Sequence, residues 1–213
     1  MKRLIGLLAS LIVAVAAFAQ TPEEIISRME AAMDAHENDG LVMTMDIKMP
    51  IIGTLSTTTR MLGDKFRAEG SMKDKKVIYW NDGTTKWTYD SEKNEVTVEN
   101  VTAEEKEKDK QSSGADDLAM FSGITAGYDV SIKSETASVW NLLCRKSKTN
   151  TDKDDPRTMN LVVAKGTYYP VSISAKMKGV TVTLRDLSYG VSEKDVTFNK
   201  ADYPTAKIID KRQ

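Results

Sequence analysis

The sequence predicts a mainly β protein of the α+β class, built around an antiparallel sheet. Segments that alternate apolar and polar residues with a period of two recur through most of the chain. Helical patterns occur only near the start, at residues 21–35, and in the middle, at residues 102–124. Because strands and helices do not alternate along the chain, a parallel sheet is disfavoured.

The first nineteen residues are expected to be a signal peptide. Two basic residues precede an almost wholly apolar run, and residues 17–19 place small side chains at the two positions that a signal peptidase reads. Cleavage after Ala19 would leave Gln20 as the first residue. Since Gln20 is not cysteine, we expect no lipid anchor. The rest of the chain, residues 20–213, is expected to form a single domain in the periplasm.

The first element after this segment is expected to be a helix. Thr21 is a typical N-cap, Pro22 suits the first helical position, and Glu24 stands three residues after the cap. Met29 and Met33 then fall on one face at helical spacing. The period changes to two at Gly40, where strands begin.

The predicted strands fall into two blocks on either side of the helical insertion. In residues 41–49, Leu, Met, Met, Ile and Met alternate with Val, Thr, Asp and Lys, which predicts one apolar and one largely wet face. The other predicted strands are residues 55–62, 65–69, 77–80, 86–89, 95–98, 128–133, 137–146, 158–164, 170–177 and 180–187, with one short strand in 196–209. The middle block, residues 102–124, opens with a second capping box and is expected to form one or two helices.

Composition excludes several classes of function. The formal net charge is −1, with both signs mixed along the chain, so no nucleic-acid-binding surface is expected. The chain has one histidine, His36, and one cysteine, Cys144. A zinc site with several histidines is therefore excluded, and a histidine-based triad could use only His36. Cys144 is expected to be a small core residue. No cofactor is expected, and we expect the protein not to be an enzyme.

A weak calcium-loop pattern occurs at Asn150, Asp152 and Asp154. Its sixth position is Asp155 rather than glycine, and its twelfth is Leu161 rather than glutamate. A solvated loop is therefore the preferred interpretation.

Methionine is the informative residue type. The sequence holds eleven, and Met43, Met45 and Met49 share one face of a predicted strand. Methionine is flexible and polarizable, so it suits either an ordinary core or a surface that adapts to variable apolar ligands. An antiparallel sheet with one apolar face can curl around a space. The pattern leaves both interpretations open.

The chain resembles the outer-membrane lipoprotein carrier family, the LolA type. The strongest local match is residues 81–90, NDGTTKWTYD, followed by Val-Thr-Val at 96–98. The early helix, the insertion at 102–124, the strands in 169–187 and the closing stretch 196–210 occur in the family's order and spacing. The resemblance implies an incomplete, strongly curved antiparallel barrel covered by helices.

The resemblance also implies a function. Family members receive acylated lipoproteins from an inner-membrane releasing transporter, shield the acyl chains and pass them to an outer-membrane acceptor. A monomeric periplasmic carrier is therefore expected here. The side chains expected to line its lipid-binding cavity are Leu41, Met43, Met45, Ile47, Met61, Phe66, Tyr79, Trp87, Tyr89, Leu118, Met120 and Phe121. Arg67 is the expected lid latch, and Arg60 competes with it for that role.

Two other functions stay open. A domain with the same fold could sense lipids or envelope proteins by contact, without shuttling, and a barrel with a filled interior would favour it. A carboxylate hydrolase would need two close carboxylates with shifted pKa values in an open groove. The sequence does not show which carboxylates face each other.

Overall fold

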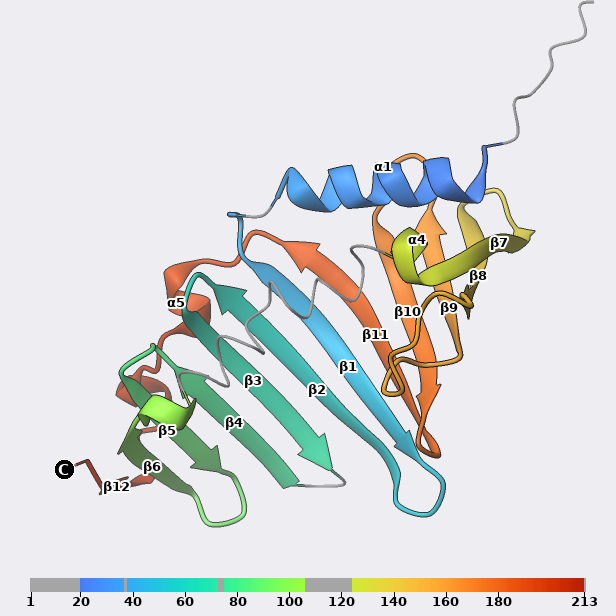
Figure 1. The fold of residues 1–213 in the computed structure, drawn as a ribbon. Helices are drawn as coiled ribbons and strands as arrows, with labels where there is room; N and C mark the ends of the chain where they lie inside the picture. The colour runs from blue at the N-terminus through green and yellow to red at the C-terminus, as the bar shows by residue number, and fades with distance from the viewer. Residues whose placement is uncertain (1–19, 37, 73–74, 106–123, 213) are drawn as a thin grey trace, which may run out of the picture.

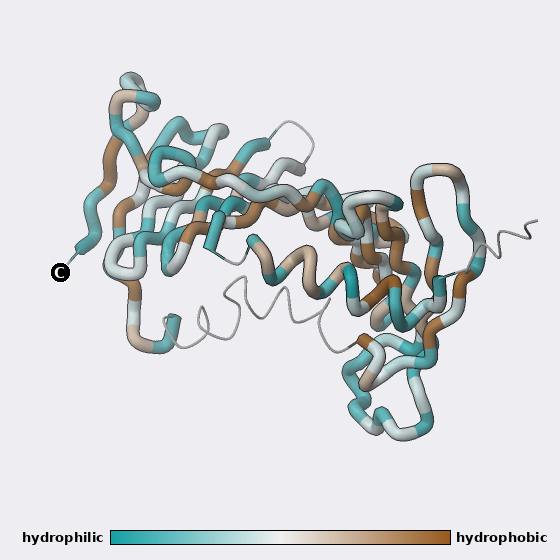
Figure 2. The backbone as a smooth tube through the Cα atoms, turned by 90° about the horizontal axis from the view of Figure 1, so that it is seen from above, coloured by the Kyte–Doolittle hydropathy of each residue, from teal (hydrophilic) through white to brown (hydrophobic). Residues whose placement is uncertain are grey.

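One sheet of twelve strands forms the body of the protein (Figure 1). The structure, a computed structural model, describes residues 20–36, 38–72, 75–105 and 124–212. The strand order is β12-β6-β5-β4-β3-β2-β1-β11-β10-β9-β8-β7, and every neighbouring pair is antiparallel except β12 with β6. The sheet is open, with β7 and β12 at its edges, and it bends around the first helix (Figure 2). This confirms the predicted fold class.

The strands lie where the period-two segments predict them. Three of them, β1, β9 and β10, have the predicted bounds, and the others begin or end within a few residues of them. The bounds are β1 Leu41–Met49, β2 Gly53–Leu62, β3 Lys65–Met72, β4 Lys75–Asn81, β5 Thr85–Asp90, β6 Glu95–Asn100, β7 Tyr128–Glu135, β8 Val139–Lys146, β9 Thr158–Ala164, β10 Pro170–Met177, β11 Val180–Tyr189 and β12 Lys207–Asp210. Two elements of the C-terminal segment were not predicted: the short helix α5 (Glu193–Val196) and the 3₁₀ turn η1 (Lys200–Asp202).

The first helix, α1 (Pro22–Asp34), has the predicted capping box. The Thr21 hydroxyl accepts a hydrogen bond from the backbone N–H of Glu24, and the Glu24 carboxylate accepts one from the backbone N–H of Thr21, both at 3.2 Å. Two free N–H groups of the helix start are thereby satisfied. The residues of α1 that are buried against the sheet are Ile25, Ile26, Met29 and Met33. No helix among the described residues is long and apolar enough to cross a membrane.

A glycine fixes the connection from α1 to β1. Gly40 has φ +68°, and a Cβ atom there would lie 2.7 Å from the carbonyl oxygen of Met61 and 2.8 Å from Cβ of Val191. Only glycine fits both this backbone conformation and this close approach. The backbone N–H groups of Gly190 and Val191 donate to the carbonyl of Asp39 at 3.0 Å, which holds the same turn against the end of β11.

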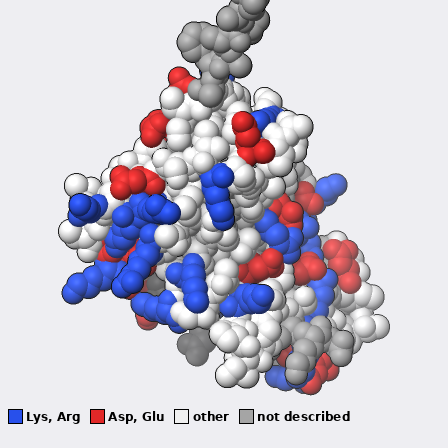
Figure 3. Space-filling model, turned by 90° about the vertical axis from the view of Figure 1, so that its right-hand side faces the viewer, with Lys and Arg blue, Asp and Glu red and all other residues white. Residues whose placement is uncertain are grey.

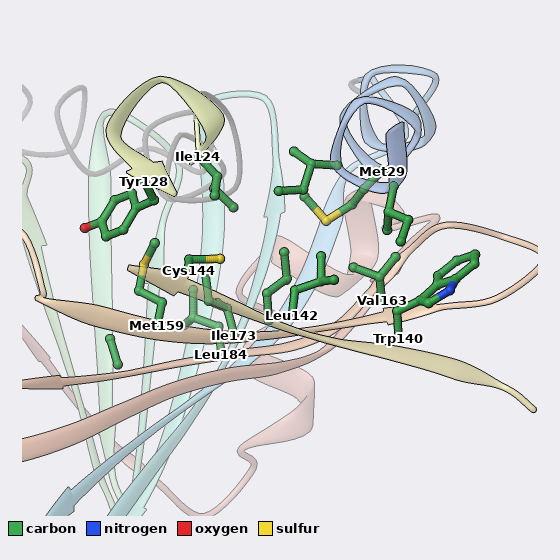
Figure 4. Packing of buried hydrophobic residues seen from close by; sticks show 14 of the residues in the cluster. Met29, Ile124, Tyr128, Trp140, Leu142, Cys144, Met159, Val163, Ile173 and Leu184 are labelled. Atoms are coloured by element: carbon green, nitrogen blue, oxygen red, sulfur yellow. The ribbon is translucent and has the colours of Figure 1, made fainter. Parts of the chain in front are cut away.

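The two faces of the sheet differ, and α1 defines them. We call the face on which α1 packs the inner face, and directly paired residues of neighbouring strands share a face. α1 and the short helix α4 (Ile124–Gly127) pack on the inner face of β8–β11, and a continuous hydrophobic core lies between them and the strands (Figure 4). Members of this core cluster include Met29, Leu142, Leu161, Ile173 and Leu184, all 3% exposed or less. Cys144 is fully buried in the same cluster, as predicted.

The outer face is polar at the centre of the sheet. Arg185 of β11 donates from Nε to Oδ2 of Asp46 at 2.7 Å, and the Ser56 hydroxyl donates to Oδ1 of Asp46 at 2.6 Å. The Arg185 guanidinium holds the pKa of the Asp46 carboxyl below its usual value. β1 therefore has the predicted apolar face and wet face.

The C-terminal segment covers the outer face of β2–β5 (Figure 1). α5 packs on β2 and β3, where Glu193 forms an ion pair with Lys65. Phe198 lies 5.4 Å from the ring of Trp80 and 5.6 Å from the ring of Trp87, measured between centroids. Val196 is 1% exposed. The sheet thus has a second, smaller core on its outer face.

The predicted insertion is described only at its ends. The capping box at Thr102 is confirmed: its hydroxyl accepts from the backbone N–H of Glu105 at 3.2 Å, and Glu105 accepts from the backbone N–H of Thr102 at 2.8 Å. The short helix predicted near residues 116–123 lies outside the described residues.

Candidate functional site

The inner face of β1–β4 brings together most of the side chains that the sequence assigns to a lipid site. Strand register decides this. In one row, Leu41 pairs with Met61, and Met61 with Phe66. In the next row, Met43 pairs with Thr59, Thr59 with Ala68, and Ala68 with Tyr79. Because these rows share a face with Met45, which packs against the core cluster, they lie on the inner face. The predicted residues united there are Leu41, Met43, Met45, Ile47, Met61, Phe66 and Tyr79.

Three further apolar side chains belong to this surface. Met49 follows Ile47 on the same face of β1, and Leu55 pairs with Ile47. Val77 pairs with Gly70, which pairs with Thr57 on the inner face. Val77 is 45% exposed. The alternation of β1 in the sequence predicts that Met49 lies on this face. The face of Val77 follows only from the register of β3 and β4.

Burial varies across the surface. Leu41 and Met43 are each 5% exposed, so this end is filled by packing. Met45, Ile47, Met61, Phe66 and Tyr79 are half-buried. The surface therefore combines a packed end with side chains that still reach solvent.

A strip of small side chains separates the larger ones. On the inner face, β2 and β3 carry Thr57, Thr59, Ala68 and Gly70 between the methionines of β1 and the Tyr79 row of β4. A Cβ atom at Gly70 would approach only Oγ1 of Thr57, at 3.4 Å, and a backbone oxygen at 3.9 Å. The ring of Phe66 lies 5.5 Å from the ring of Tyr79 at one end of the strip. Small residues flanked by large flexible ones suit an elongated apolar ligand.

A charged border limits the apolar surface at β5. Lys86 lies on the inner face, where it forms ion pairs with Glu105 and, at 3.7 Å, with Glu99. Its side chain is only 15% exposed. The Lys86 ammonium and the hydrogen bonds from Thr102 lower the pKa of Glu105 to about 2, and the same pair raises the pKa of Lys86. The pair holds residue 105 against the inner face of β5.

Removing this pair should have a small, pH-dependent effect. Because the pKa of Glu105 is lowered from 4.5 to about 2, its contribution to stability is present above pH 4.5 and lost as the pH falls toward 2. We expect Glu105→Gln to lower the free energy of unfolding at pH 7 by about 0.5–1 kcal/mol, since the pair is partly exposed. Urea titrations from pH 7 downward should show the two proteins converging; a difference independent of pH would contradict this assignment.

Trp87 and Tyr89 lie on the opposite face from the other predicted site residues. Trp87 pairs with Trp80, and Tyr79 of the inner face pairs with Thr88. The Trp87 ring stacks on Phe198 at 5.6 Å, and the Tyr89 ring lies 4.6 Å from Tyr203. The expectation that they share a surface with the methionines is corrected: they belong to the outer core, and Lys86 and Thr88 take the inner face.

Arg67 and Arg60 also lie on the outer face. They pair with each other across β2 and β3, in the row that contains Trp80. Arg67 donates to Oε2 of Glu69 at 2.8 Å, and its guanidinium carbon lies 5.5 Å from the centre of the Trp80 ring. The described contacts thus hold Arg67 on the outer core rather than on the inner face where a latch was expected. The remaining predicted residues, Leu118, Met120 and Phe121, lie outside the described residues.

Cys144 and His36, both among the described residues, do not form a pair of nucleophile and base: Cys144 lies in the core, and the Nδ1 atom of His36 is hydrogen-bonded to Asp39. Burial raises the pKa of the Cys144 thiol to about 11. His36, just after α1, donates from Nδ1–H to Oδ2 of Asp39 at 2.6 Å, and its ring stacks on the ring of Tyr189 with the centroids 5.0 Å apart. Among the described residues, no group of three or more His, Cys, Asp or Glu side chains is placed to hold a metal ion.

Comparison with known proteins identifies a fold. No family model and no curated protein sequence matches the chain. Among solved structures, lipoprotein LppX of Mycobacterium tuberculosis has a TM-score of 0.52 at 10% identity, covering 81% of this chain and 98% of that one. The protein shares the fold of LppX. At this identity the likeness concerns the fold alone.

Other solved structures match with TM-scores below 0.5. The LolA superfamily protein NE2245 from Nitrosomonas europaea has a TM-score of 0.31 at 9% identity and covers 84% of this chain and 99% of its own. MucB, crystallised in complex with MucA, has a TM-score of 0.40 at 14% identity and covers 83% of this chain and 59% of its own.

Proposed function

We propose that this LolA-like protein is a periplasmic carrier that binds the acyl chains of lipoproteins on the inner face of β1–β4. One observation supports the proposal above the others: seven side chains that the sequence assigns to a lipid site lie on one face, across four neighbouring strands. The opposite face at β1 is polar, where Asp46 pairs with Arg185. The mechanism is binding and release, with no covalent bond made or broken, so we propose no enzymatic activity.

Magnitudes limit how such a carrier can work. Complete burial of an acyl chain would contribute about 10 kcal/mol, at about 0.8 kcal/mol for each CH₂ group. A lipoprotein with two or three fully buried chains would approach the limit of non-covalent affinity and would not be released. An open sheet whose apolar side chains are half-buried favours partial burial, which is compatible with handing the cargo on. The proposed partners are an inner-membrane releasing transporter and an outer-membrane acceptor.

A second candidate function is an interaction module of the cell envelope that senses lipids or proteins without shuttling. The packing of Leu41 and Met43, each 5% exposed, favours it because a filled surface holds no ligand. Half-buried side chains further along β1 favour the carrier.

Mass spectrometry of material that co-purifies with the protein from native periplasm tests the carrier proposal. We expect diacylated or triacylated peptides, released when the protein is denatured. The matched control is the Met61→Glu variant purified in the same way, which should carry less acylated material. Native protein without any acylated peptide, and without affinity for a fluorescent fatty acid, would favour the interaction module.

A further inference from the structure

The tip of the β1–β2 hairpin carries two exposed isoleucines. Ile51 is 97% exposed and Ile52 is 64% exposed, the two highest values among the large apolar side chains of the described residues. Hairpin turns favour Gly, Pro, Asn, Asp and Ser, and Pro50 and Gly53 satisfy that preference. The isoleucines serve neither the turn nor a core. Their exposure therefore points to a contact outside the chain.

The tip extends beyond the neighbouring strands. Among the described residues, pairing of β1 with β11 ends at Lys48 and Thr181, and pairing of β2 with β3 ends at Ser56 and Ser71. Beyond these positions β1 and β2 pair only with each other. Figure 1 shows the hairpin reaching past the ends of β3 and β11. The two isoleucines can therefore contact another molecule or a membrane without steric hindrance from β3 and β11.

Two exposed lysines lie near the tip, on the outer face. Lys48 and Lys176 both pair with Thr181, so the two exposed lysines lie in one row on the outer face, close to the hairpin. Lys178, in the β10–β11 turn, forms an ion pair with Asp154 at 3.0 Å. Residues 47–59 and 170–184 contain no Asp or Glu. Lys and Arg also gather on the side of the molecule formed by β7–β10 (Figure 3).

Size and charge together decide what the tip contacts. Two side chains at the end of a hairpin are far smaller than the roughly 800 Å² that each partner buries in a stable protein interface. Insertion into a bilayer needs only a few apolar side chains at the boundary of headgroups and acyl chains, with cations beside them. A surface of anionic phospholipid fits both features.

We propose that the β1–β2 tip is a membrane-docking element: Ile51 and Ile52 enter the bilayer surface while Lys48 and Lys176 contact anionic lipid headgroups. Docking in this orientation brings Met49, the first apolar side chain of the inner face, next to the membrane. The proposal concerns membrane contact and does not depend on acyl-chain binding, so each can fail without the other.

Co-sedimentation with vesicles of phosphatidylglycerol and phosphatidylethanolamine tests the proposal. We expect the Ile51→Ser/Ile52→Ser double variant to bind these vesicles about tenfold more weakly than the wild type. The matched control is Ile132→Ser/Val171→Ser, which removes exposed apolar side chains elsewhere on the sheet and should change binding less than about twofold. Lys48→Gln/Lys176→Gln should weaken binding to anionic vesicles and leave the weaker binding to pure phosphatidylcholine unchanged.

A fluorescent label at the tip measures insertion into the bilayer directly, without relying on the affinities of these variants. Cys144 is fully buried, so an Ile51→Cys variant can be labelled selectively with an environment-sensitive dye. Anionic vesicles should shift its emission to the blue, whereas a label at Val171→Cys should not respond. Wild-type protein that stays in the supernatant, or equal binding by the tip variant, would overturn the proposal. So would self-association of the wild type without vesicles that the tip variant abolishes, which would make the tip a dimer contact.

Discussion

Replacing Met61 with glutamate is expected to weaken acyl-chain binding by about tenfold to a hundredfold, because a bound chain would strip water from the new carboxylate. Met61 is half-buried on the inner face, between Leu41 and Phe66. In the free protein the carboxylate can reach water, so the free energy of unfolding should fall by only about 1–2 kcal/mol. The same substitution at Met45 would test acyl-chain binding less directly, because Met45 packs against the core cluster beneath α1 and its replacement would also affect folding.

The pH dependence of the Met61→Glu variant provides an internal check. Burial under an acyl chain raises the pKa of the introduced carboxyl, so protonation favours the bound state. Its affinity should therefore recover toward that of the wild type as the pH falls from 7 to about 4. The control is Ser71→Glu, which adds the same charge at an exposed position on the outer face. Both are measured with a fluorescent fatty acid; equal affinities at pH 7 would remove Met61 from the site.

Replacing Trp80 with alanine is expected to cost about 3–5 kcal/mol of the free energy of unfolding, since it empties the outer core. Trp80 is 3% exposed, and its ring lies within 6 Å of Phe198, Tyr203 and the Arg67 guanidinium. Acyl-chain affinity of the folded variant should be unchanged, because Trp80 lies on the face opposite to Met61.

Urea titration and fatty-acid binding together separate the two cores. Val77→Ala is the matched control, since Val77 lies on the inner face of the same strand and is 45% exposed. Its truncation should cost less than about 1 kcal/mol. A folded Trp80→Ala protein that had lost acyl-chain binding would contradict the assignment of faces.

Much of this arrangement can be predicted from the sequence where one strand alternates without interruption. In β1 the period of two continues for nine residues, so Met43, Met45 and Ile47 must share a face. The capping box at Thr21 predicts where α1 begins, and Gly40 predicts where β1 begins. These signals are local, and local signals survive folding when the packing agrees with them.

The orientation of β5 could not be predicted in this way. Alternation shows that Trp87 and Tyr89 share a face, but the number of residues in the turn after Asn81 decides which face it is. A one-residue change in register exchanges the two faces of a strand. Alternation of apolar residues assigns them to the inner face only where the outer face is exposed to solvent. Here the C-terminal segment covers the outer face of β5, where Phe198 stacks on Trp87. Arg67, the latch that the resemblance implies, lies on the same covered face, where Trp80 is its aromatic partner.

The position of β1 at the centre of the sheet has a consequence for the order of folding. β1 pairs on one side with β2, the next strand in the chain, and on the other with β11, which is about 140 residues distant, as in the pair Met45 and Leu184. β6 likewise stays an open edge until β12 arrives from the C-terminus. Contacts so far apart in sequence form slowly. The chain is therefore expected to complete its sheet only after β11 and β12 have been synthesised, and until then the methionines of β1 can be bound by chaperones.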